Sequence, residues 1–270
     1  MRDITLKELL EAGCHFGHQS NRWHPKAKDY IYTERDGVHI IDLSKTRECL
    51  LKAGAYLSDL AKSGGNVIFV GTKRQAKSIV EEQARQVREK FGDGSGFYYL
   101  LERWPGGLLT NFDTIKKNNL DAIVRLQKDI ADNNFVTKKE KLLAQRKLSN
   151  YQKIYAGLVG LTSLPEAVFI IDVKREAGTI SEALRTGVKI VAITDTNVDP
   201  TPVDYQIPAN DDAAGSIKII TETLVEAWVE GREEFEKVKK TVQAEEAKKK
   251  AEANKKSEAV DYKVEKAETV

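Results

Sequence analysis

The chain has 270 residues, of which 41% are hydrophobic and 31% are charged, and its formal net charge is +2 at pH 7. This composition can bury a core, and the near balance of charge means that partners must be inferred from local clusters of charge. Two cysteines are too few for a disulfide framework, and no apolar run approaches the ~20 residues of a membrane span, so we expect a soluble cytoplasmic protein without a signal peptide.

Local patterns in the first quarter of the chain alternate between helix, loop and strand signals. Capping residues and apolar residues at helical spacing indicate helices, whereas β-branched and aromatic runs around a Gly-containing turn indicate a hairpin. In chain order these patterns predict a helix capped by Thr5 and ended at Gly13, a loop over 14–26, a strand at 30–33, a strand at 38–42 and a helix over 44–62.

The central and C-terminal parts alternate short apolar runs with helical patterns. Continuous apolar strands between helices are typical of a parallel sheet that is buried on both faces. We therefore predict an α/β fold, with a Rossmann- or flavodoxin-like parallel sheet covered by helices. The strands are expected at 67–70, 97–101, 167–171 and 189–194, and the helices at about 74–90, 179–185 and 211–230.

One segment, residues 111–160, interrupts this alternation. It contains two stripes of apolar residues at helical spacing, one including Ile123 and Leu126 and the other including Leu142, Leu143 and Leu148. They predict a long antiparallel helical hairpin inserted into the sheet domain. Ten Lys and Arg residues against five acidic residues give the insertion a surplus of five positive charges. Such a basic arm suits RNA, and we expect the sheet domain to fold without residues 113–158.

The division of the chain follows from these patterns. Residues 1–230 form the α/β domain, which carries the inserted hairpin over 111–160. Residues 231–270 are rich in Lys and Glu and nearly lack large apolar side chains. Such a segment buries too little surface to offset its chain entropy, which predicts a charged flexible tail.

The stretch Gly71–Ser78 resembles a phosphate-binding loop, because an apolar strand precedes it and Lys77 and Ser78 have the required spacing. Ala76, however, occupies a position where such a loop needs glycine for close approach to the phosphates. Asp172 follows an apolar strand, as a magnesium-binding Asp would, but such an Asp is common in parallel sheets. An ordinary strand-to-helix turn is the better interpretation. The alternative is a phosphate- or nucleotide-binding α/β enzyme that uses Gly71–Ser78 and Asp172.

Other polar clusters have both a structural and a functional interpretation. Cys14, His15, His18 and His24 could supply four zinc ligands, but their spacing matches no standard finger, so we expect no metal there. Residues 210–212, Asn-Asp-Asp, lie where the N-cap of a helix belongs. Residues 195–197, Asp-Thr-Asn, follow a strand; turn chemistry is the stronger interpretation and a polar site remains open.

The strongest binding signal is for RNA. Two loops, 22–26 and 103–107, each place a tryptophan beside cations, and only three tryptophans exist in the chain. Exposed Trp and Arg stack on unpaired bases, while Lys and Arg neutralise phosphates. The structural alternative is that both tryptophans anchor their loops to the core. The residues expected on an RNA-binding face are His15, His18, Arg22, Trp23, His24, Lys26, Lys73, Arg74, Arg103, Trp104, Asn111, Lys116 and Lys117.

Several stretches together resemble the family of ribosomal protein S2 of the bacterial small subunit, from the N-terminus to about residue 230. They are His-Phe-Gly-His-Gln at 15–19, Val-His-Ile-Ile-Asp-Leu at 38–43, Phe-Val-Gly-Thr-Lys-Arg at 69–74, Arg-Trp-Pro-Gly-Gly-Leu-Leu-Thr-Asn-Phe at 103–112, Asp-Thr-Asn-Val-Asp-Pro at 195–200 and Ile-Pro-Ala-Asn-Asp-Asp at 207–212. The tail beyond Gly231 has no such match.

The resemblance implies a structural role in translation rather than an enzyme activity. It implies binding to 16S ribosomal RNA between the head and the body of the small subunit, with neighbouring small-subunit proteins as partners and without a cofactor. It also implies that the protein helps to dock the large RNA-binding ribosomal protein S1. The expected location is the ribosome in the cytoplasm.

Overall fold

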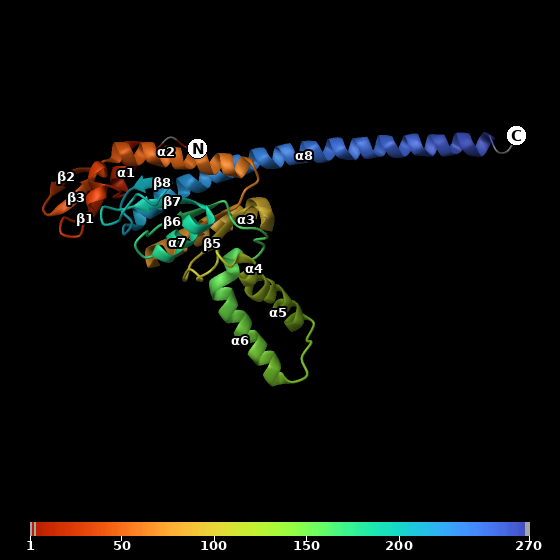
Figure 1. Ribbon diagram of the computed structural model, residues 1–270, viewed down its shortest axis with the longest axis horizontal. Helices are drawn as coiled ribbons and strands as arrows, with labels where there is room; N and C mark the ends of the chain where they lie inside the picture. Colours follow the sequence, from red (N-terminus) through yellow and green to blue (C-terminus); the bar gives the residue numbers. More distant parts are fainter. Residues whose placement is uncertain (1, 3, 268–270) are drawn as a thin grey trace.

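The computed structural model of the chain describes residues 2 and 4–267 (Figure 1). The α-helices are α1 (Leu6–Glu11), α2 (Leu43–Lys62), α3 (Arg74–Phe91), α4 (Phe112–Ile115), α5 (Asp121–Ala131), α6 (Lys138–Tyr155), α7 (Ala177–Thr186) and α8 (Ala214–Ala267). The strands are β1 (Phe16–Gln19), β2 (Ile31–Arg35), β3 (Val38–Ile41), β4 (Val67–Val70), β5 (Phe97–Leu100), β6 (Ala167–Ile170), β7 (Lys189–Thr194) and β8 (Tyr205–Pro208). No helix among these residues is both long enough and apolar enough to cross a bilayer.

The main sheet is parallel and has five strands in the order β5-β4-β6-β7-β8. Numbered along the sheet domain, this is the flavodoxin-like order 2-1-3-4-5. The predicted α/β fold is therefore confirmed. Figure 1 shows a second, three-stranded antiparallel sheet, β1-β3-β2, at the end of the domain that is opposite the extended part of α8.

Alternate residues of each strand enter two different cores, as the two-residue period of a strand requires. Phe69 of β4 packs with α2, α3 and α8 on one face, whereas Ile68 and Val70 pack with α7 and the base of the helical hairpin on the other. Burial on both faces explains why these strands are continuous apolar runs. The layers are therefore helix, sheet and helix.

Two local predictions are confirmed in atomic detail. The side chain of Thr5 accepts a hydrogen bond from the backbone of Glu8, and Glu8 reaches back to Thr5, which is a capping box for α1. Asp36 and Gly37 both have positive φ, 52° and 75°, in the two-residue turn between β2 and β3. That backbone conformation matches the twist of a hairpin and suits an Asp-Gly pair.

Residues 14–26 are not entirely a loop, and that part of the prediction is wrong. Residues Phe16–Gln19 form β1, which pairs antiparallel with β3. The strand is half exposed and has no apolar alternation of its own. A Cβ on Gly17 would lie 2.7 Å from Cγ2 of Thr196, so the glycine lets β1 approach the loop after β7. Contacts with residues far along the chain therefore decide this strand.

The last helix does not end at Glu230, which is a second correction. α8 continues through Gly231 to Ala267 and projects from the domain (Figure 1). A Cβ on Gly231 would lie 2.2 Å from the backbone oxygen of Ser58, so this glycine allows α8 to cross α2 closely rather than ending the helix. Residues 268–270 of the predicted tail lie outside the described residues. The mobility of residues 231–270 stays a prediction.

The inserted hairpin is present as α5 and α6, which extend together away from the sheet (Figure 1). α4, a π-helical segment over Lys116–Leu120 and α5 follow one another directly. Its base belongs to the core on the α7 side of the sheet, here called the second core. Leu120, Ile123, Tyr155 and Leu158 are buried there. Beyond the base, the apolar contact expected between the two helices is incomplete. Leu142 and Leu143 are 47% and 54% exposed, and Ala144 is buried in their place.

Candidate functional site

A polar cavity of about 420 Å³ opens at the carboxyl edge of the main sheet. The strand order reverses between β4 and β6, and ligands of flavodoxin-like folds bind outside the carboxyl ends of the strands at such a reversal. The segments that follow β4, β6 and β7 all contribute to this cavity. Its lining residues are His18, Arg22, Lys73, Asp172, Lys174, Arg175, Asn197, Asp211 and Asp212.

Lys73, the residue before α3, is the cationic centre of this cavity. Its Nζ atom lies 2.7 Å from Asp212 Oδ1, 2.9 Å from Asp211 Oδ1 and 3.5 Å from Asp172 Oδ2. Burial opposes the charged form, but the hydrogen bonds to Asp212 and Asp211 outweigh it, and the pKa of Lys73 lies above its usual value. The lysine therefore joins the ends of β4 and β6 to the segment before α8.

His18 of β1 reaches the same cavity from the small sheet. Its Nδ1 atom lies 3.1 Å from Asp195 Oδ2, and its Nε2 atom lies 3.5 Å from Asp212 Oδ2. Its backbone N–H donates a hydrogen bond of 2.9 Å to the hydroxyl of Thr196. The hydrogen bond with Asp195 raises the pKa of His18 above 6.5, although partial burial opposes this shift.

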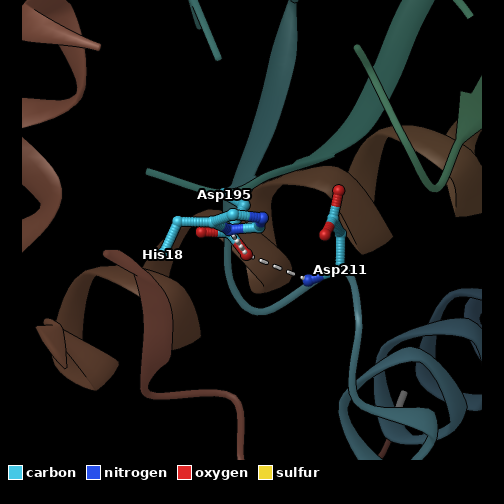
Figure 2. A group of neighbouring side chains, drawn as sticks. All are labelled: His18, Asp195 and Asp211. Atoms are coloured by element: carbon cyan, nitrogen blue, oxygen red, sulfur yellow. Dashed lines mark hydrogen bonds and ion pairs between the residues drawn. The ribbon is translucent and has the colours of Figure 1, made fainter. Parts of the chain in front are cut away.

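Two carboxylates at the centre of the cluster are almost completely buried. Asp195, directly after β7, is 2% exposed and Asp211 is 3% exposed. Figure 2 shows these two side chains together with that of His18. Burial, followed by repulsion from Asp195, raises the pKa of Asp211 to about 6, although Lys73 opposes the shift. The sequence analysis placed residues 210–212 at the start of the last helix, and the structure has them directly before α8. The side chain of Asn210 accepts hydrogen bonds from the N–H groups of Asp212 and Ala213, which forms a turn ahead of the helix.

The stretch Gly71–Ser78 forms the ordinary strand-to-helix turn. A Cβ on Gly71 would lie 2.7 Å from Cγ2 of Val80, so the glycine lets α3 pack against the end of β4. Ala76 is fully buried, and Lys77 Nζ lies 2.8 Å from Glu102 Oε1. Asp172 accepts a hydrogen bond from the backbone of Arg175. Gly71, Lys77 and Asp172 thus each have a structural partner.

Cys14, His15, His18 and His24, which the sequence analysis weighed as zinc ligands, do not form a group of converging ligand atoms in the described part of the chain. Among the described residues, the group whose ligand atoms come together consists of His18, Asp195 and Asp211. Cys14 is buried, and its burial raises the pKa of its thiol to about 11, which disfavours the thiolate that binds metals. The side chain of His24 accepts a hydrogen bond from the backbone of Lys26.

The predicted RNA-binding residues of the 15–26 region are only partly exposed. Arg22, Trp23 and Lys26 are exposed, whereas His15, His18 and His24 are half-buried. Trp23 retains 37% exposure and packs beside His39, with 5.3 Å between the ring centroids. Lys26 Nζ lies 2.7 Å from Asp199 Oδ2.

For Trp104, in the loop after β5, the sequence left two roles open: stacking on an RNA base or anchoring the loop to the core. Arg103 is exposed, whereas Trp104 packs against the second core and donates its indole N–H to Glu182. Farther along, Asn111 and Lys117 are exposed, and Lys116 donates a hydrogen bond of 2.8 Å to the backbone oxygen of Thr162. Trp104 therefore anchors its loop.

Sequence reasoning missed Glu182, Lys174 and Arg175. Glu182 accepts hydrogen bonds from Trp104, Gly107 and Leu109, and nothing in its local sequence points to that loop. Lys174 and Arg175 follow β6 and are exposed at the rim of the cavity. The sequence could have indicated the position of Lys174 and Arg175, because residues that follow parallel strands gather at one edge of the sheet.

Comparisons with known proteins identify a family. The family model described as ribosomal protein S2 matches residues 9–231. The small ribosomal subunit protein uS2 of Chloroflexus aurantiacus is 46% identical over 231 residues, which cover 85% of this chain and 94% of the relative. The protein of that name from Dictyoglomus thermophilum is 44% identical over 240 residues, 88% of this chain and 94% of the relative. That of Bdellovibrio bacteriovorus is 42% identical over 238 residues, 87% and 73% respectively.

Proposed function

Because the chain belongs to the ribosomal protein S2 family, we propose that it is a structural constituent of the small ribosomal subunit in translation. It binds 16S ribosomal RNA between the head and the body, next to other small-subunit proteins. Its place of action is the ribosome in the cytoplasm. The observation that carries the RNA contact is the set of exposed cations at one edge of the sheet.

These cations share an edge because the strands that precede them are parallel. Arg74 begins the helix after β4, Arg103 follows β5, and Lys174 and Arg175 follow β6; all four are exposed. Arg22 joins them at the rim of the polar cavity. Guanidinium and ammonium groups on one surface suit a run of phosphates. Lys73 is not retained among them, because three carboxylates already surround its charge.

The helical hairpin offers a second basic surface. A groove of about 290 Å³ on the hairpin is lined by Lys117, Arg125 and Lys147, with Asp129 as the acidic residue of its lining. Leu142, Leu143 and Val124 stay exposed beyond the base. A long arm with exposed cations and exposed apolar side chains suits a surface formed jointly by RNA and neighbouring proteins.

The test is binding of the purified protein to small subunits that lack it, measured over a range of salt concentrations. Arg74→Ala and Arg103→Ala should each lower the salt slope of binding by about one unit. Arg85→Ala is the matched control: it is an exposed arginine of α3, about 16 Å along the helix from Arg74 and farther from the carboxyl edge. Equal slopes for all three variants would oppose this RNA face.

The proposal also includes docking of ribosomal protein S1, and the support for this part is the resemblance in the sequence. Small subunits rebuilt with the wild-type protein should retain S1 during sedimentation, and subunits without it should lose S1. Retention of S1 by subunits that lack the protein would remove this part of the proposal and leave the RNA contact standing.

The second candidate function is a phosphate- or nucleotide-binding enzyme that uses Gly71–Ser78 and Asp172. The geometry favours it less, because Lys77 is paired with Glu102 and Gly71 serves helix packing. We expect calorimetric titration with ATP and Mg²⁺ to give no saturable binding. Micromolar binding that is abolished in Lys77→Ala would support the enzyme instead.

A further inference from the structure

We propose that the cleft between the loop after β5 and the last turns of α6 binds one unpaired nucleotide of RNA, with the base inside the cleft and its phosphates on the rim. The cleft lies at the base of the hairpin, where α6 returns to the sheet domain (Figure 1). It rests on the proposed role in RNA binding and assigns an unpaired base to this part of the surface. Its volume is about 440 Å³, and its lining residues are Glu102, Arg103, Asn150, Lys153 and Ile154.

Helical spacing places three of the lining residues on one side of α6. Asn150, Lys153 and Ile154 are three or four positions apart, a spacing that brings side chains together on one face of a helix. Glu102 and Arg103, directly after β5, line the opposite side of the cleft. Two segments that are distant in the chain therefore form its two walls.

Both walls are anchored to the second core, so the cleft is formed before a ligand binds. Trp104, next to Arg103, packs against that core and donates its indole N–H to Glu182. On the α6 side, Ile154 packs against the same core and Tyr155 is buried in it. A site that is already formed loses less conformational entropy when a ligand binds.

The charge of the cleft suits a phosphate backbone. Its acidic lining residue, Glu102, is paired with Lys77 at 2.8 Å, and this hydrogen bond lowers the pKa of Glu102. Arg103 and Lys153 are exposed, and within the described part of the chain neither forms a salt bridge. Three cations, Lys77, Arg103 and Lys153, against one carboxylate leave a surplus of two positive charges. Unpaired guanidinium and ammonium groups favour an anionic ligand.

The uncharged groups of the cleft suit a base. The amide of Asn150 offers an acceptor and two donors, which match the edge of an unpaired base. Ile154 and the aliphatic stems of Arg103 and Lys153 supply apolar surface, and the planar guanidinium of Arg103 can stack on a base. In duplex RNA the bases are stacked and paired, so their faces and pairing edges are not free for these contacts. The ligand is therefore an unpaired nucleotide.

The cleft also connects the two basic surfaces of the proposed RNA face. Arg103 belongs to the cations at the carboxyl edge of the main sheet. Lys147, which lines the groove on the hairpin, lies on α6 three positions before Asn150, so the two side chains are neighbours. A strand of RNA that reaches from one surface to the other passes the cleft, with phosphates held on both sides of it.

The test uses the full-length purified chain and two RNA probes with equal charge, octaadenylate and an octamer of the same ribose-phosphate backbone without bases. Fluorescence anisotropy measures binding over a range of salt concentrations. The wild type should bind octaadenylate about fivefold more tightly, or better, than the abasic octamer. Equal binding of the two probes, or no saturable binding of octaadenylate, would overturn the base site.

Two substitutions separate the base from the phosphates. Asn150→Ala should weaken binding of octaadenylate about three- to tenfold without changing the salt slope, because it removes hydrogen bonds and no charge. Lys153→Ala should lower the salt slope by about one unit for both probes. Gln152→Ala is the matched control, because it removes an exposed amide of α6 that does not line the cleft, and it should bind as the wild type does.

Unchanged binding of octaadenylate by Asn150→Ala would also remove the base site. The RNA face would still stand, because the salt slopes of Arg74→Ala and Arg103→Ala on small subunits measure it separately. Cross-linking of the wild type to an octamer that carries 4-thiouridine keeps the test decisive if a variant does not fold. Cross-links at 102–103 or 150–154 support the site, and cross-links confined to other segments contradict it. Displacement of octaadenylate by polyglutamate of equal charge would assign the cleft to acidic protein segments instead.

Discussion

The carboxylate of Glu182 on α7 accepts a hydrogen bond of 3.1 Å from the indole nitrogen of Trp104 in the loop after β5. The same carboxylate accepts hydrogen bonds of 2.7 Å from the backbone of Gly107 and 3.0 Å from that of Leu109. One side chain thus holds three donors of a loop more than 70 residues earlier in the chain. Trp104 packs against the second core, whereas the neighbouring Arg103 is exposed.

We expect Glu182→Ala to destabilise the protein by about 2–4 kcal/mol. The substitution leaves three donors without their acceptor, and each unsatisfied buried donor costs about 1–3 kcal/mol where water cannot replace the partner. Denaturant unfolding measures the loss. Glu81→Ala, an exposed carboxylate on α3, is the control and should change stability by less than about 0.5 kcal/mol. A loss of similar size in both variants would mean that the hydrogen bonds to Glu182 matter little.

Substitutions of the two loop tryptophans should affect different properties: that of Trp104 mainly stability, and that of Trp23 mainly RNA binding. Trp104→Ala should lower the free energy of unfolding by about 2–4 kcal/mol, because the ring packs against the second core. Trp23→Ala should lower the free energy of unfolding less, because its ring keeps 37% exposure while it packs beside His39. It should weaken binding to the small subunit by about 1–3 kcal/mol, because the exposed part of the ring can stack on a base. Circular dichroism and sedimentation binding measure the two effects. Normal occupancy of Trp23→Ala at raised salt would remove Trp23 from the RNA face.

A pair of glycines tests the close crossing of α8 over α2. Gly231→Ala should destabilise the protein by about 1–3 kcal/mol, because the new Cβ would lie 2.2 Å from the backbone oxygen of Ser58. Gly178→Ala in α7 meets no atom within 4 Å and should be neutral or slightly stabilising, since alanine favours a helix. Thermal and denaturant unfolding compare the two. Equal stability of the two variants would show that α8 shifts away from α2 at little cost.

The hairpin should be removable only beyond its base. Replacing 125–146 by a short Gly/Ser linker should leave the domain folded, because Arg125 and Lys147 line one groove and so bring the two ends together. The same deletion should weaken assembly into the subunit. Removing 113–158 should instead unfold or strongly destabilise the domain, because it deletes Leu120, Ile123, Tyr155 and Leu158 from the second core.

Melting temperatures and sedimentation of the two deletion proteins decide this prediction. If the shorter deletion fails to fold, the tip of the hairpin also contributes to the core. If the longer one folds normally, the original division at 111 and 160 is restored, and the burial at the base is dispensable.

Much of the fold followed from the order of residues alone. The strands at 67–70 and 189–194 are continuous apolar runs because both faces of the sheet are covered, and their bounds agree with the structure. The turn at Asp36 and Gly37 and the cap at Thr5 are equally local, because each depends on residues within three positions. The family, too, was recognisable from short motifs.

Tertiary structure decided what depends on distant partners. β1 exists through its pairing with β3, and Gly231 lies within α8 because α2 leaves room only for a glycine there. Trp104 and Trp23 stand in similar sequence contexts, yet only Trp104 has Glu182 beside it. His18, Asp195 and Asp211 meet because the strand order places β7 and the start of α8 beside the small sheet. Short-range patterns carry no information about such pairings, since the free energy that selects them comes from burial and charge contributed by residues nearly 200 positions apart.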